Sequence, residues 1–562
     1  TPVGLTLAVI VGMVAGLAAV GFRWLIENFQ VIFFDGGKEL FTFLGEYYVI
    51  IIPAIGGLLV GPLVYFLARE ARGHGVPEVM EAVALKGGRI RPRVSAVKAL
   101  ASSITIGSGG SVGREGPIVQ IGASFGSAIA QWLKLPEGTV KILVACGAAG
   151  GIAASFNAPI AGVFFALEVI LGRVVTRKFA YVVTSAVVAS VIAQAISGSE
   201  PAFSIPAFGI VSPWEFLFYI ALGITAAAAA VIFIKVLYKS EDLFALLKMP
   251  EYFKPILGGL AVGAIGFFNS DLFGVGYSGI DKALSGEMAI SALLLVGLLK
   301  ILATSFTLGS GGSGGVFAPS LFIGAMLGTA VGTAVGSIFP NITAPAGAYG
   351  VVGMAAVFAG TARAPFTAIL IIFEMTHDYA IMLPLMLTVA VSIVLSRAFK
   401  KESIYTLKLL RRGVDIEREE VNDIMRTISV KQAMTTDFPT VTENMNIDRL
   451  IDEFRKTGHH AFPVLDKNKQ LMGIVTQTDV TRHMGTENLK NYKTVGDIAT
   501  RSLYLAYPEQ TLDKVLEATE EEYVNIPVVS RDKPKELLGV LRRQGIIRAY
   551  RKATKKQKLL KK

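Results

Sequence analysis

Residues 107–117 read Gly107-Ser-Gly-Gly-Ser-Val-Gly-Arg-Glu-Gly-Pro117, and residues 309–319 read Gly309-Ser-Gly-Gly-Ser-Gly-Gly-Val-Phe-Ala-Pro319. The first five residues of the two runs are identical, and the closing prolines lie at the same offset. Glycines within membrane-like sequence are tolerated where the backbone is buried in protein or lines a cavity. Two such runs in corresponding places therefore predict a binding site between two repeats.

Long uncharged segments indicate a membrane protein over most of the chain. The 562 residues are 52% hydrophobic, and no Asp, Glu, Lys or Arg occurs in residues 1–22, 142–167 or 301–362. About 20 apolar residues cross a bilayer as a helix, so the longest of these segments can hold more than one span. Polar residues concentrate after about Lys400. The sequence predicts an integral membrane domain followed by a soluble one.

Charge and rare residue types exclude several function classes. The net charge is +11, but the densest basic run, Arg551–Lys562, is a terminal tail. Such a tail is solvated or lies near anionic lipid, and it does not indicate a nucleic-acid site. The single cysteine, Cys146, excludes an intrachain disulfide and a cysteine-cluster metal site. The sequence contains neither a His-Glu-x-x-His zinc motif nor a phosphate-binding P-loop, so we expect no enzyme activity and no required cofactor.

The repeat extends beyond the glycine-rich runs. Lys98-Ala-Leu-Ala-Ser-Ser-Ile-Thr-Ile-Gly107 matches Lys300-Ile-Leu-Ala-Thr-Ser-Phe-Thr-Leu-Gly309 at an offset of 202. Residues of about 1–200 and 210–400 are therefore predicted to be two related halves. An Ala-Pro pair followed by an acid also recurs, at an offset of 206, as Ala158-Pro159 with Glu168 and Ala364-Pro365 with Glu374. The sequence leaves the orientation of the halves open, although an inverted arrangement is common in transporters.

Apolar segments near the two runs are short and broken by Gly or Pro, which predicts helices that end inside the membrane. Pro117 and Pro319 lie where first-turn prolines occur in helices. A helix N-terminus carries unsatisfied N–H groups and about half a positive charge, so it attracts anions. The two runs therefore predict two helix starts beside an anion site.

The soluble part also repeats itself, with a period of about 64 residues. Each unit is predicted as a short strand, an amphipathic helix, two strands and a helix. The predicted boundaries are a membrane domain over 1–405, a connector over 406–428, soluble units over 429–488 and 492–550, and a basic tail over 551–562.

Four membrane motifs together resemble the CLC family of chloride channels and chloride/proton exchangers. They are Gly73-His-Gly-Val-Pro77, Gly113-Arg-Glu-Gly-Pro117, Gly315-Val-Phe-Ala-Pro319 and Tyr405. The soluble tandem is similar to a CBS domain pair, which many CLC proteins carry. The resemblance implies a mostly α membrane protein with an inverted repeat of about seventeen membrane helices, followed by a cytoplasmic α/β CBS tandem. It also implies a homodimer in the cell membrane, surrounded by lipid, with a separate pathway in each subunit.

The resemblance assigns roles to residues of both glycine-rich runs. It identifies Glu115 as the gate, whose carboxylate competes with the anion and leaves when protonated. The alternative for Glu115 is a static ion pair, for example with Arg114. The anion is implied to lie among His74, Gly75, Arg114, Gly116, Val316, Phe317 and Tyr405. Backbone N–H groups and hydroxyls of this kind hold an anion without a fixed full charge, so it can leave quickly.

Two positions depart from the family pattern. His74 stands where the family usually has a serine, and its imidazole is larger and titrates near neutral pH. His74 either donates to the anion or leaves that role to the backbone, so the selectivity among chloride, nitrate and fluoride stays open. Val169 stands where exchangers often carry an internal proton acceptor, after Glu168. Chloride/proton exchange is predicted, with a passive chloride channel as the alternative.

The first soluble unit carries a candidate nucleotide site. Residues 473–479 have the form Gly-h-h-Thr-x-x-Asp (h apolar), with Thr476 and Asp479 in the places that nucleotide-binding CBS pairs use for the ribose and phosphate. The second unit has Arg542 and Arg543 there instead, so one regulatory site for ATP, or for ADP or AMP, is predicted. The alternative is that Thr476 and Asp479 only cap a helix.

Overall fold

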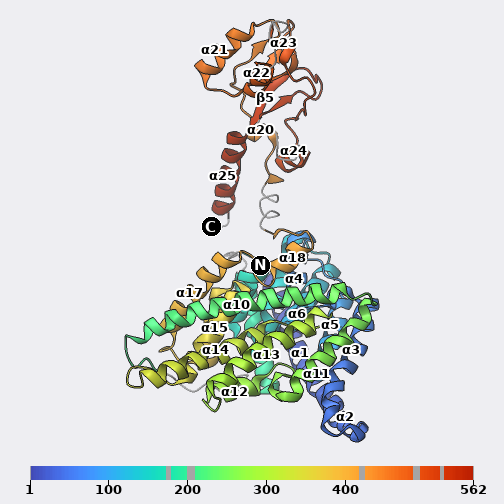
Figure 1. Cartoon of the computed structure of the whole chain (residues 1–562). Coiled ribbons are helices and arrows are strands. Elements are labelled where there is room, and N and C mark those ends of the chain that lie inside the picture. Colours follow the sequence, from blue (N-terminus) through green and yellow to red (C-terminus); the bar gives the residue numbers. More distant parts are fainter. Residues whose placement is uncertain are drawn as a thin grey trace. The chain divides into compact units, whose positions relative to one another are not determined.

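The computed structural model describes residues 2–172, 179–198, 209–416, 425–484, 494–518 and 525–560. They belong to two compact units, Thr1–Ile416 and Glu417–Lys562 (Figure 1). The first unit is helical and contains both membrane repeats, and the strands belong to the second. The predicted class, a helical membrane domain followed by an α/β tandem, is confirmed.

The first unit consists of two series of helices. The first half contains α1 (Pro2–Gln30), α2 (Gly36–Leu40), α3 (Tyr48–Leu67), α4 (Val76–Leu85), α5 (Arg93–Gly107), α6 (Glu115–Trp132), α7 (Glu137–Phe156), α8 (Pro159–Phe165) and α9 (Phe179–Ser197). The second half contains α10 (Glu215–Leu246), α11 (Lys254–Phe268), α12 (Tyr277–Leu284), α13 (Ile290–Gly309), α14 (Phe317–Ile338), α15 (Ala346–Ala362), α16 (Pro365–Thr376), α17 (Met382–Phe399) and α18 (Thr406–Arg411).

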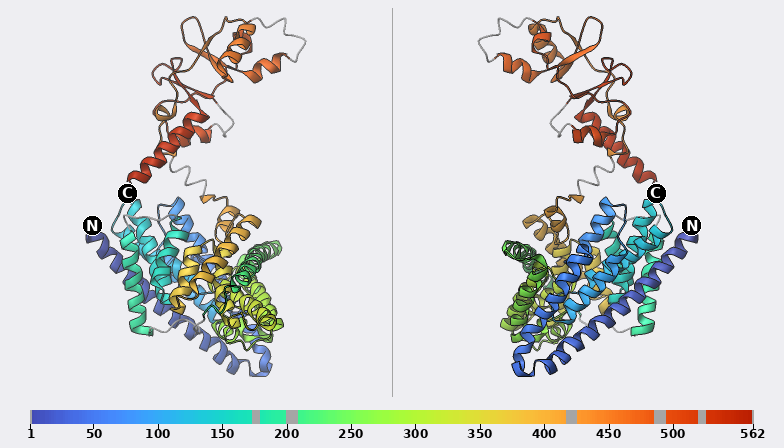
Figure 2. Two further views of the ribbon diagram at one scale, coloured as in Figure 1. Left: turned by 90° about the vertical axis from the view of Figure 1, so that its left-hand side faces the viewer. Right: turned by 90° about the vertical axis from the view of Figure 1, so that its right-hand side faces the viewer.

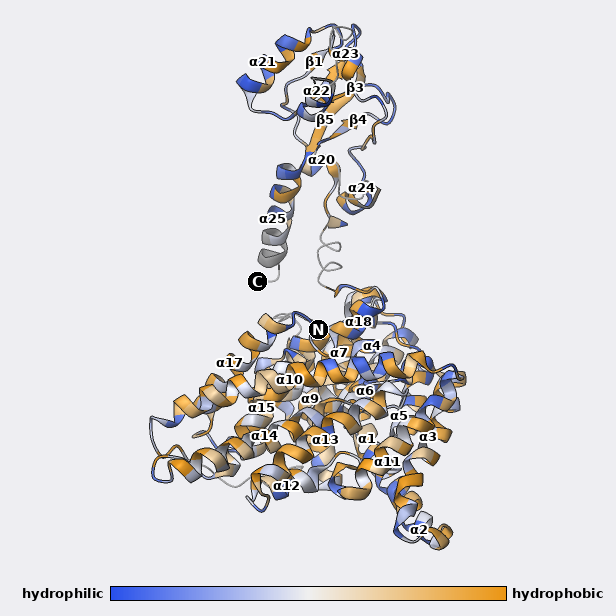
Figure 3. Cartoon of the chain, in the orientation of Figure 1, coloured by the Kyte–Doolittle hydropathy of each residue, from blue (hydrophilic) through white to orange (hydrophobic). Residues whose placement is uncertain are grey.

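Long apolar helices identify this unit as the membrane domain. Eight helical segments of the described residues are long and apolar enough to cross a membrane. Figure 3 shows apolar residues along α10, α13 and α14, and Figure 2 shows α1 (blue) running obliquely along one side. Helices α4, α8, α12 and α16 are shorter, and only α8 lies in a segment predicted to be short; α7 is long enough to span.

Equivalent helices of the two halves pack in an antiparallel manner. A Cβ added to Gly57 of α3 would touch the carbonyl of Pro255 in α11, and a Cβ added to Gly259 would touch that of Pro53. Rising residue numbers along one helix therefore meet falling numbers along the other. Both contacts are also related by the repeat offset of 202. The repeat is inverted, and the pseudo-twofold axis passes between α3 and α11.

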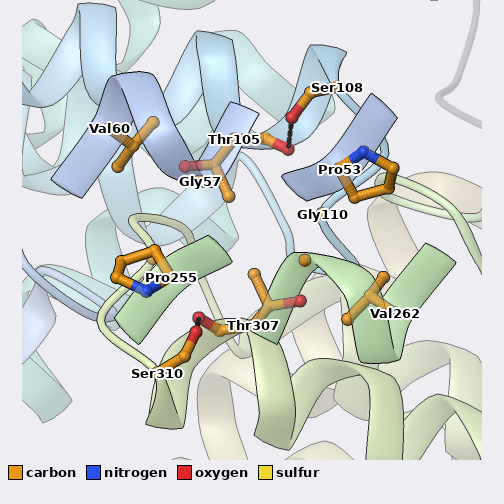
Figure 4. A pocket seen from close by; sticks show the side chains of 12 residues that line it. Pro53, Gly57, Val60, Thr105, Ser108, Gly110, Pro255, Val262, Thr307 and Ser310 are labelled. Carbon is orange, nitrogen blue, oxygen red and sulfur yellow. Dashed lines mark hydrogen bonds between the residues drawn. The ribbon is translucent and has the colours of Figure 1, made fainter. Parts of the chain in front are cut away.

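A small cavity marks this axis (Figure 4). Its volume of about 20 Å³ is enough for about one water molecule. Every lining residue has its repeat equivalent in the lining, so the residues around the cavity are symmetric with respect to the repeat. The pairs are Pro53 and Pro255, Gly57 and Gly259, Val60 and Val262, Thr105 and Thr307, Ser108 and Ser310, and Gly110 and Gly312.

The second unit contains two small sheets. Its elements are α20 (Val430–Ala433), β1 (Val441–Thr442), α21 (Ile447–Thr457), β2 (Ala461–Leu465), β3 (Leu471–Thr476), α22 (Gln477–Met484), α23 (Val495–Ile498), α24 (Leu512–Ala518), β4 (Asn525–Val529), β5 (Leu537–Arg542) and α25 (Arg543–Leu560). β1 and β2 are parallel, whereas β2–β3 and β4–β5 are antiparallel. The segment after α20 pairs with β5 through Thr435 and Val540, and the segment after α23 pairs with β3 through Thr500 and Ile474. The two soluble repeats therefore exchange strand contacts.

The predicted connector is only partly covered by these elements. Its first residues form α18, and residues 417–424 lie outside the described residues. α18 is tied to α4 by Arg412, whose guanidinium lies 2.9 Å from a carboxylate oxygen of Glu78.

Candidate functional site

Glycine-rich turns meet at the centre of the first unit. Gly113 and Gly315, which are equivalent in the repeat, exchange two backbone hydrogen bonds with N···O distances of 2.8 and 2.6 Å. The N–H of Gly73 donates to the Gly312 carbonyl at 3.0 Å, and the Gly73 carbonyl accepts from Gly314 at 3.2 Å. The Gly73-His-Gly-Val-Pro77 motif therefore lies against the second glycine-rich run.

Close backbone contacts explain why these turns need glycine. A Cβ on Gly116 would clash with the carbonyl of His74. A Cβ on Gly315 would lie 2.7 Å from the backbone nitrogen of Gly116. The absence of side chains lets three stretches of backbone approach one another at one point.

Helix N-termini surround this point. α6 begins at Glu115, α14 at Phe317 and α4 at Val76. Pro117 and Pro319 lie in the first turns of α6 and α14, as predicted. The unsatisfied N–H groups and positive dipole ends of these helices create a place that favours negative charge without a fixed ionic partner.

The Glu115 carboxylate lies at this place. Glu115 is fully buried, and its Oε1 accepts a hydrogen bond of 2.8 Å from the hydroxyl of Tyr277. The carboxylate also lies beside the backbone N–H of Ala318, in the first turn of α14. Its Oε2 accepts no hydrogen bond within the described residues. The Nε of Arg114 is 3.9 Å from Oε1, which is within ion-pair distance but too long for a hydrogen bond.

Tyr277 is a candidate functional residue that sequence reasoning missed. It begins α12, and its hydroxyl is the direct partner of Glu115. A signal was present: Gly274-Val-Gly-Tyr277 repeats the Gly-x-Gly pattern of Gly73-His-Gly-Val76 at an offset of 201. The slip of one residue from the offset of 202 hid this match.

His74 lies in the wall of the site with both ring nitrogens unused. The side chain is 1% exposed, and neither nitrogen has a hydrogen-bond partner within the described residues. Its ring centroid is 6.0 Å from that of Tyr405, which is also buried. A buried imidazole normally has a partner, so the two ring nitrogens of His74 are available to a ligand.

Two buried lysines hold the turn that carries His74. Lys98 Nζ donates at 3.0 and 2.7 Å and Lys408 Nζ at 3.4 Å to three successive carbonyls of the turn, those of Ala71, Gly73 and Arg72. The carbonyl side of the turn therefore faces positive charge. These ammonium groups fix the turn and make its surroundings electropositive.

The other predicted anion ligands lie around the same point. Val316 is the N-cap residue of α14 and Phe317 its first residue. The Phe317 ring packs on the Phe358 ring, with 3.9 Å between the centroids. The backbone N–H of Phe317 is at the first position of α14. A Cβ on Gly75 would lie 2.9 Å from the Gly116 carbonyl. The structure thus brings the starts of α4, α6 and α14 together.

The side chain of Arg114 lies on another side of the Glu115 carboxylate. Its guanidinium donates to the Ser155 carbonyl at 3.2 Å and lies over the Tyr277 ring at 5.4 Å from the centroid. Both side chains line a cavity of about 180 Å³, whose other polar lining residues are Arg23, Ser155, Asn157, Gln194 and Ser197.

The repeated acids Glu168 and Glu374 cap helices of the opposite half. The Glu168 carboxylate accepts the N–H groups of Phe366 and Thr367, at 3.2 and 3.0 Å, at the start of α16. The Glu374 carboxylate accepts those of Ile160 and Ala161, at 2.8 and 2.7 Å, at the start of α8. This reciprocal exchange satisfies N–H groups that would otherwise lack partners. Both acids therefore have a structural role, and Val169 beside them is buried.

Replacement of Glu168 by glutamine is expected to lower stability and to leave transport coupling unchanged. The loss of a charge-assisted cap costs about 1–2 kcal/mol, which thermal unfolding of the purified protein would measure. Glu374→Gln should have a similar effect because its geometry is equivalent. A loss of proton coupling in Glu168→Gln at normal stability would contradict the structural role.

Thr476 and Asp479 contact each other at the start of α22. The backbone N–H and the hydroxyl of Thr476 donate to Asp479 Oδ2 at 2.8 and 2.7 Å, and the N–H of Asp479 donates back to Thr476 Oγ1 at 3.2 Å. The pair therefore caps the helix. Nearby, partial burial and the positive charge of the Arg542 guanidinium hold the pKa of His459 below its usual value.

Comparison with known proteins identifies the family. The family model described as voltage gated chloride channel matches residues 56–397. The chain belongs to this family, the CLC family. It is a chloride transport protein and not an enzyme. CBS domain models match residues 430–486 and 495–552 of this CLC protein.

Individual relatives cover the membrane unit. A putative chloride channel protein, ClcB-like, from Ralstonia nicotianae is 35% identical over 74% of this CLC chain and 98% of the relative. The voltage-gated ClC-type chloride channel ClcB of Escherichia coli O17:K52:H18 is 33% identical over 71% of this chain and 97% of its own.

Solved structures agree with the same fold. A slow cyanobacterial Cl⁻/H⁺ antiporter matches with a TM-score of 0.67 and 29% identity, over 73% of this CLC chain and 98% of its own. A eukaryotic CLC transporter matches with a TM-score of 0.64 and 21% identity, over 96% and 97% of the two chains. The second match extends the similarity in fold to the soluble unit.

Proposed function

We propose that this CLC protein exchanges chloride for protons across the membrane and that Glu115 is the gate. The observation that carries the proposal is the position of the Glu115 carboxylate, which lies among helix N-termini where an anion would bind. A carboxylate there imitates the anion, and protonation removes the charge that keeps it in place. The 29% identical cyanobacterial antiporter supports exchange.

A passive chloride channel is the second candidate. Val169 occupies the place of an internal proton acceptor, and Glu168 beside it is engaged as a helix cap. Exchange then requires water to carry protons from the inner side. The two candidates differ in whether a chloride gradient can drive protons uphill.

Purified protein in liposomes would decide between the candidates. A chloride gradient should move protons against a pH gradient, and the reversal potential should depend on both ions. A reversal potential set by chloride alone, at every pH gradient tested, would establish the channel and refute exchange.

We also propose that His74 and Tyr405, with the backbone N–H groups of Val316 and Phe317, hold the central anion. Replacement of His74 by alanine should weaken chloride binding by about tenfold, because a hydrogen bond to a charged ligand is lost. Calorimetric titration of chloride would measure this change. Unchanged affinity would show that the backbone N–H groups, and not His74, bind the chloride.

The proposal includes a homodimer with the CBS pair in the cytoplasm. Apolar side chains lie exposed on helices of both halves, among them Val191 of α9, Phe366 of α16 and Leu383 of α17. Such surfaces fit another subunit or lipid. Light scattering of the protein in detergent would report the subunit number, and accessibility of the soluble unit in cells would report its side.

We further propose that the CBS pair binds one adenine nucleotide, with ATP preferred, near Thr476 and Asp479. Asp479→Ala should weaken the binding measured by calorimetry on the full chain. Asp497→Ala is the matched control, because Asp497 caps α23 in the same manner through the N–H of Thr494 at 2.9 Å. No heat with ATP, ADP or AMP would leave helix capping as the role of the Thr476–Asp479 pair.

A further inference from the structure

Two polar side chains, those of Arg114 and Tyr277, lie between a cavity and the proposed gate, Glu115. The guanidinium of Arg114 lies 5.4 Å from the centroid of the Tyr277 ring, and the Tyr277 hydroxyl donates to Glu115 Oε1 at 2.8 Å. The ring of Tyr277 lies under the Arg114 guanidinium. Tyr277 therefore contacts both the carboxylate, through its hydroxyl, and the Arg114 guanidinium, through its ring.

The backbone that carries Tyr277 is held by a buried ammonium group. Lys300 is fully buried, and its Nζ donates to the carbonyls of Leu272 and Gly274 at 3.3 and 3.1 Å. Lys98 holds the equivalent turn before α4 in the same manner. The ammonium of Lys300 thus fixes the turn from which Tyr277 projects, so the phenol keeps its direction toward Glu115.

The same phenol lines the cavity of about 180 Å³ described above. The cavity is polar on most of its lining and contains Arg23, which is paired with Glu27 at 2.9 Å. Tyr277 and Arg114 stand between this space and the Glu115 carboxylate. A carboxylate that leaves the blocking position must therefore break its bond with Tyr277.

We infer that Tyr277 is a positioning residue that latches the gate: its hydroxyl holds the Glu115 carboxylate in the blocking position and thereby sets how readily the gate opens. The inference rests on the proposed gating role of Glu115. A phenol O–H donates to a carboxylate more strongly than to a neutral carboxyl group, so the latch favours the charged, blocking form. Protonation of Glu115 weakens the latch and releases the side chain.

The charged and titratable groups around Glu115 come from three elements. Arg114 is the N-cap residue of α6, Tyr277 donates to Glu115 from the start of α12, and Tyr405 is the N-cap residue of α18 beside His74. Arg114 and Tyr405 remain when Tyr277 is replaced by phenylalanine. A change in the pH dependence of Tyr277→Phe is then caused by the missing hydroxyl.

The test measures chloride flux against pH for full-length protein in liposomes. In Tyr277→Phe, the pH of half-maximal flux should rise by about one unit, and flux at neutral pH should rise by about tenfold. Tyr349→Phe is the matched control, because the Tyr349 hydroxyl donates to another buried carboxylate, Glu215, at 3.2 Å. This control should keep the pH profile of the wild type.

Two further variants separate a latch from a packing effect. In Glu115→Ala the gate carboxylate is absent, so adding Tyr277→Phe should change neither the flux nor its pH dependence. Fluorotyrosine at position 277, a more acidic donor of similar shape, should move the midpoint downward. The fluorotyrosine variant also provides a result if Tyr277→Phe does not fold.

The outcomes distinguish the latch from the gate. A wild-type pH profile in Tyr277→Phe, or an effect that persists in the Glu115→Ala background, would overturn the latch. If Glu115→Ala itself keeps wild-type coupling and pH dependence, the proposed gate fails. A shift that is present in Tyr277→Phe, absent in Tyr349→Phe and abolished by Glu115→Ala would support both.

Discussion

Replacement of Glu115 by glutamine is expected to abolish proton coupling while chloride flux continues. The amide keeps the size and polarity of the side chain, but it carries no charge and cannot exchange a proton at physiological pH. It therefore no longer competes with the anion at the helix N-termini. The measurement is the reversal potential of liposomes under crossed chloride and pH gradients, which should follow chloride alone.

Glu374→Gln is the matched control for this experiment. Glu374 also has its carboxylate at a helix N-terminus, but it accepts the N–H groups of Ile160 and Ala161 in a closed cap. Its replacement should reduce stability and preserve coupling. If Glu115→Gln still moves protons against their gradient, Glu115 is not the coupling residue.

Replacement of Gly315 by alanine is expected to reduce anion flux to about a tenth or less. The added Cβ would lie 2.7 Å from the backbone nitrogen of Gly116 and 3.1 Å from the Gly113 carbonyl. Backbone cannot move out of the way as a flexible side chain can, so the two glycine-rich runs must separate. The N–H groups at the starts of α6 and α14 would then no longer point toward one anion position.

Gly138→Ala provides the control for a glycine replacement in the same unit. Gly138 lies in the first turn of α7, and a Cβ there would meet no atom within 4 Å. This variant should keep flux and stability, because alanine favours the helix. Flux through Gly315→Ala at the level of Gly138→Ala, with normal expression, would show that the contact is not needed for the pathway.

Sequence patterns predicted the backbone of the site better than its side chains. Matching runs and an offset of 202 revealed the two halves, and prolines in the first turns indicated the helix starts at Glu115 and Phe317. These features are local, so they leave a local signature. The inverted packing of α3 on α11 required the structure, because sequence similarity carries no information about direction in space.

Side-chain partners depend on contacts between distant segments, and the sequence does not record them. Tyr277 lies 162 residues from Glu115, and its Gly-Val-Gly-Tyr motif marks a repeated turn but not a partner for an acid. Arg114 is adjacent to Glu115 in sequence, yet its guanidinium turns to Ser155 and Tyr277. The repeated acids Glu168 and Glu374 were visible as a pair, but their exchange of helix caps was not.

The reciprocal hydrogen bonds of Gly113 and Gly315 have a consequence for the direction of transport. Backbone related by an inverted repeat presents the same chemistry to both faces of a membrane, so the backbone alone does not distinguish inward from outward transport. The difference between the two directions comes from equivalent positions that carry different side chains: Glu115 and Phe317, His74 and Val275, and Val76 and Tyr277. A few substitutions on a symmetric frame are therefore enough to make the two sides of this protein unlike.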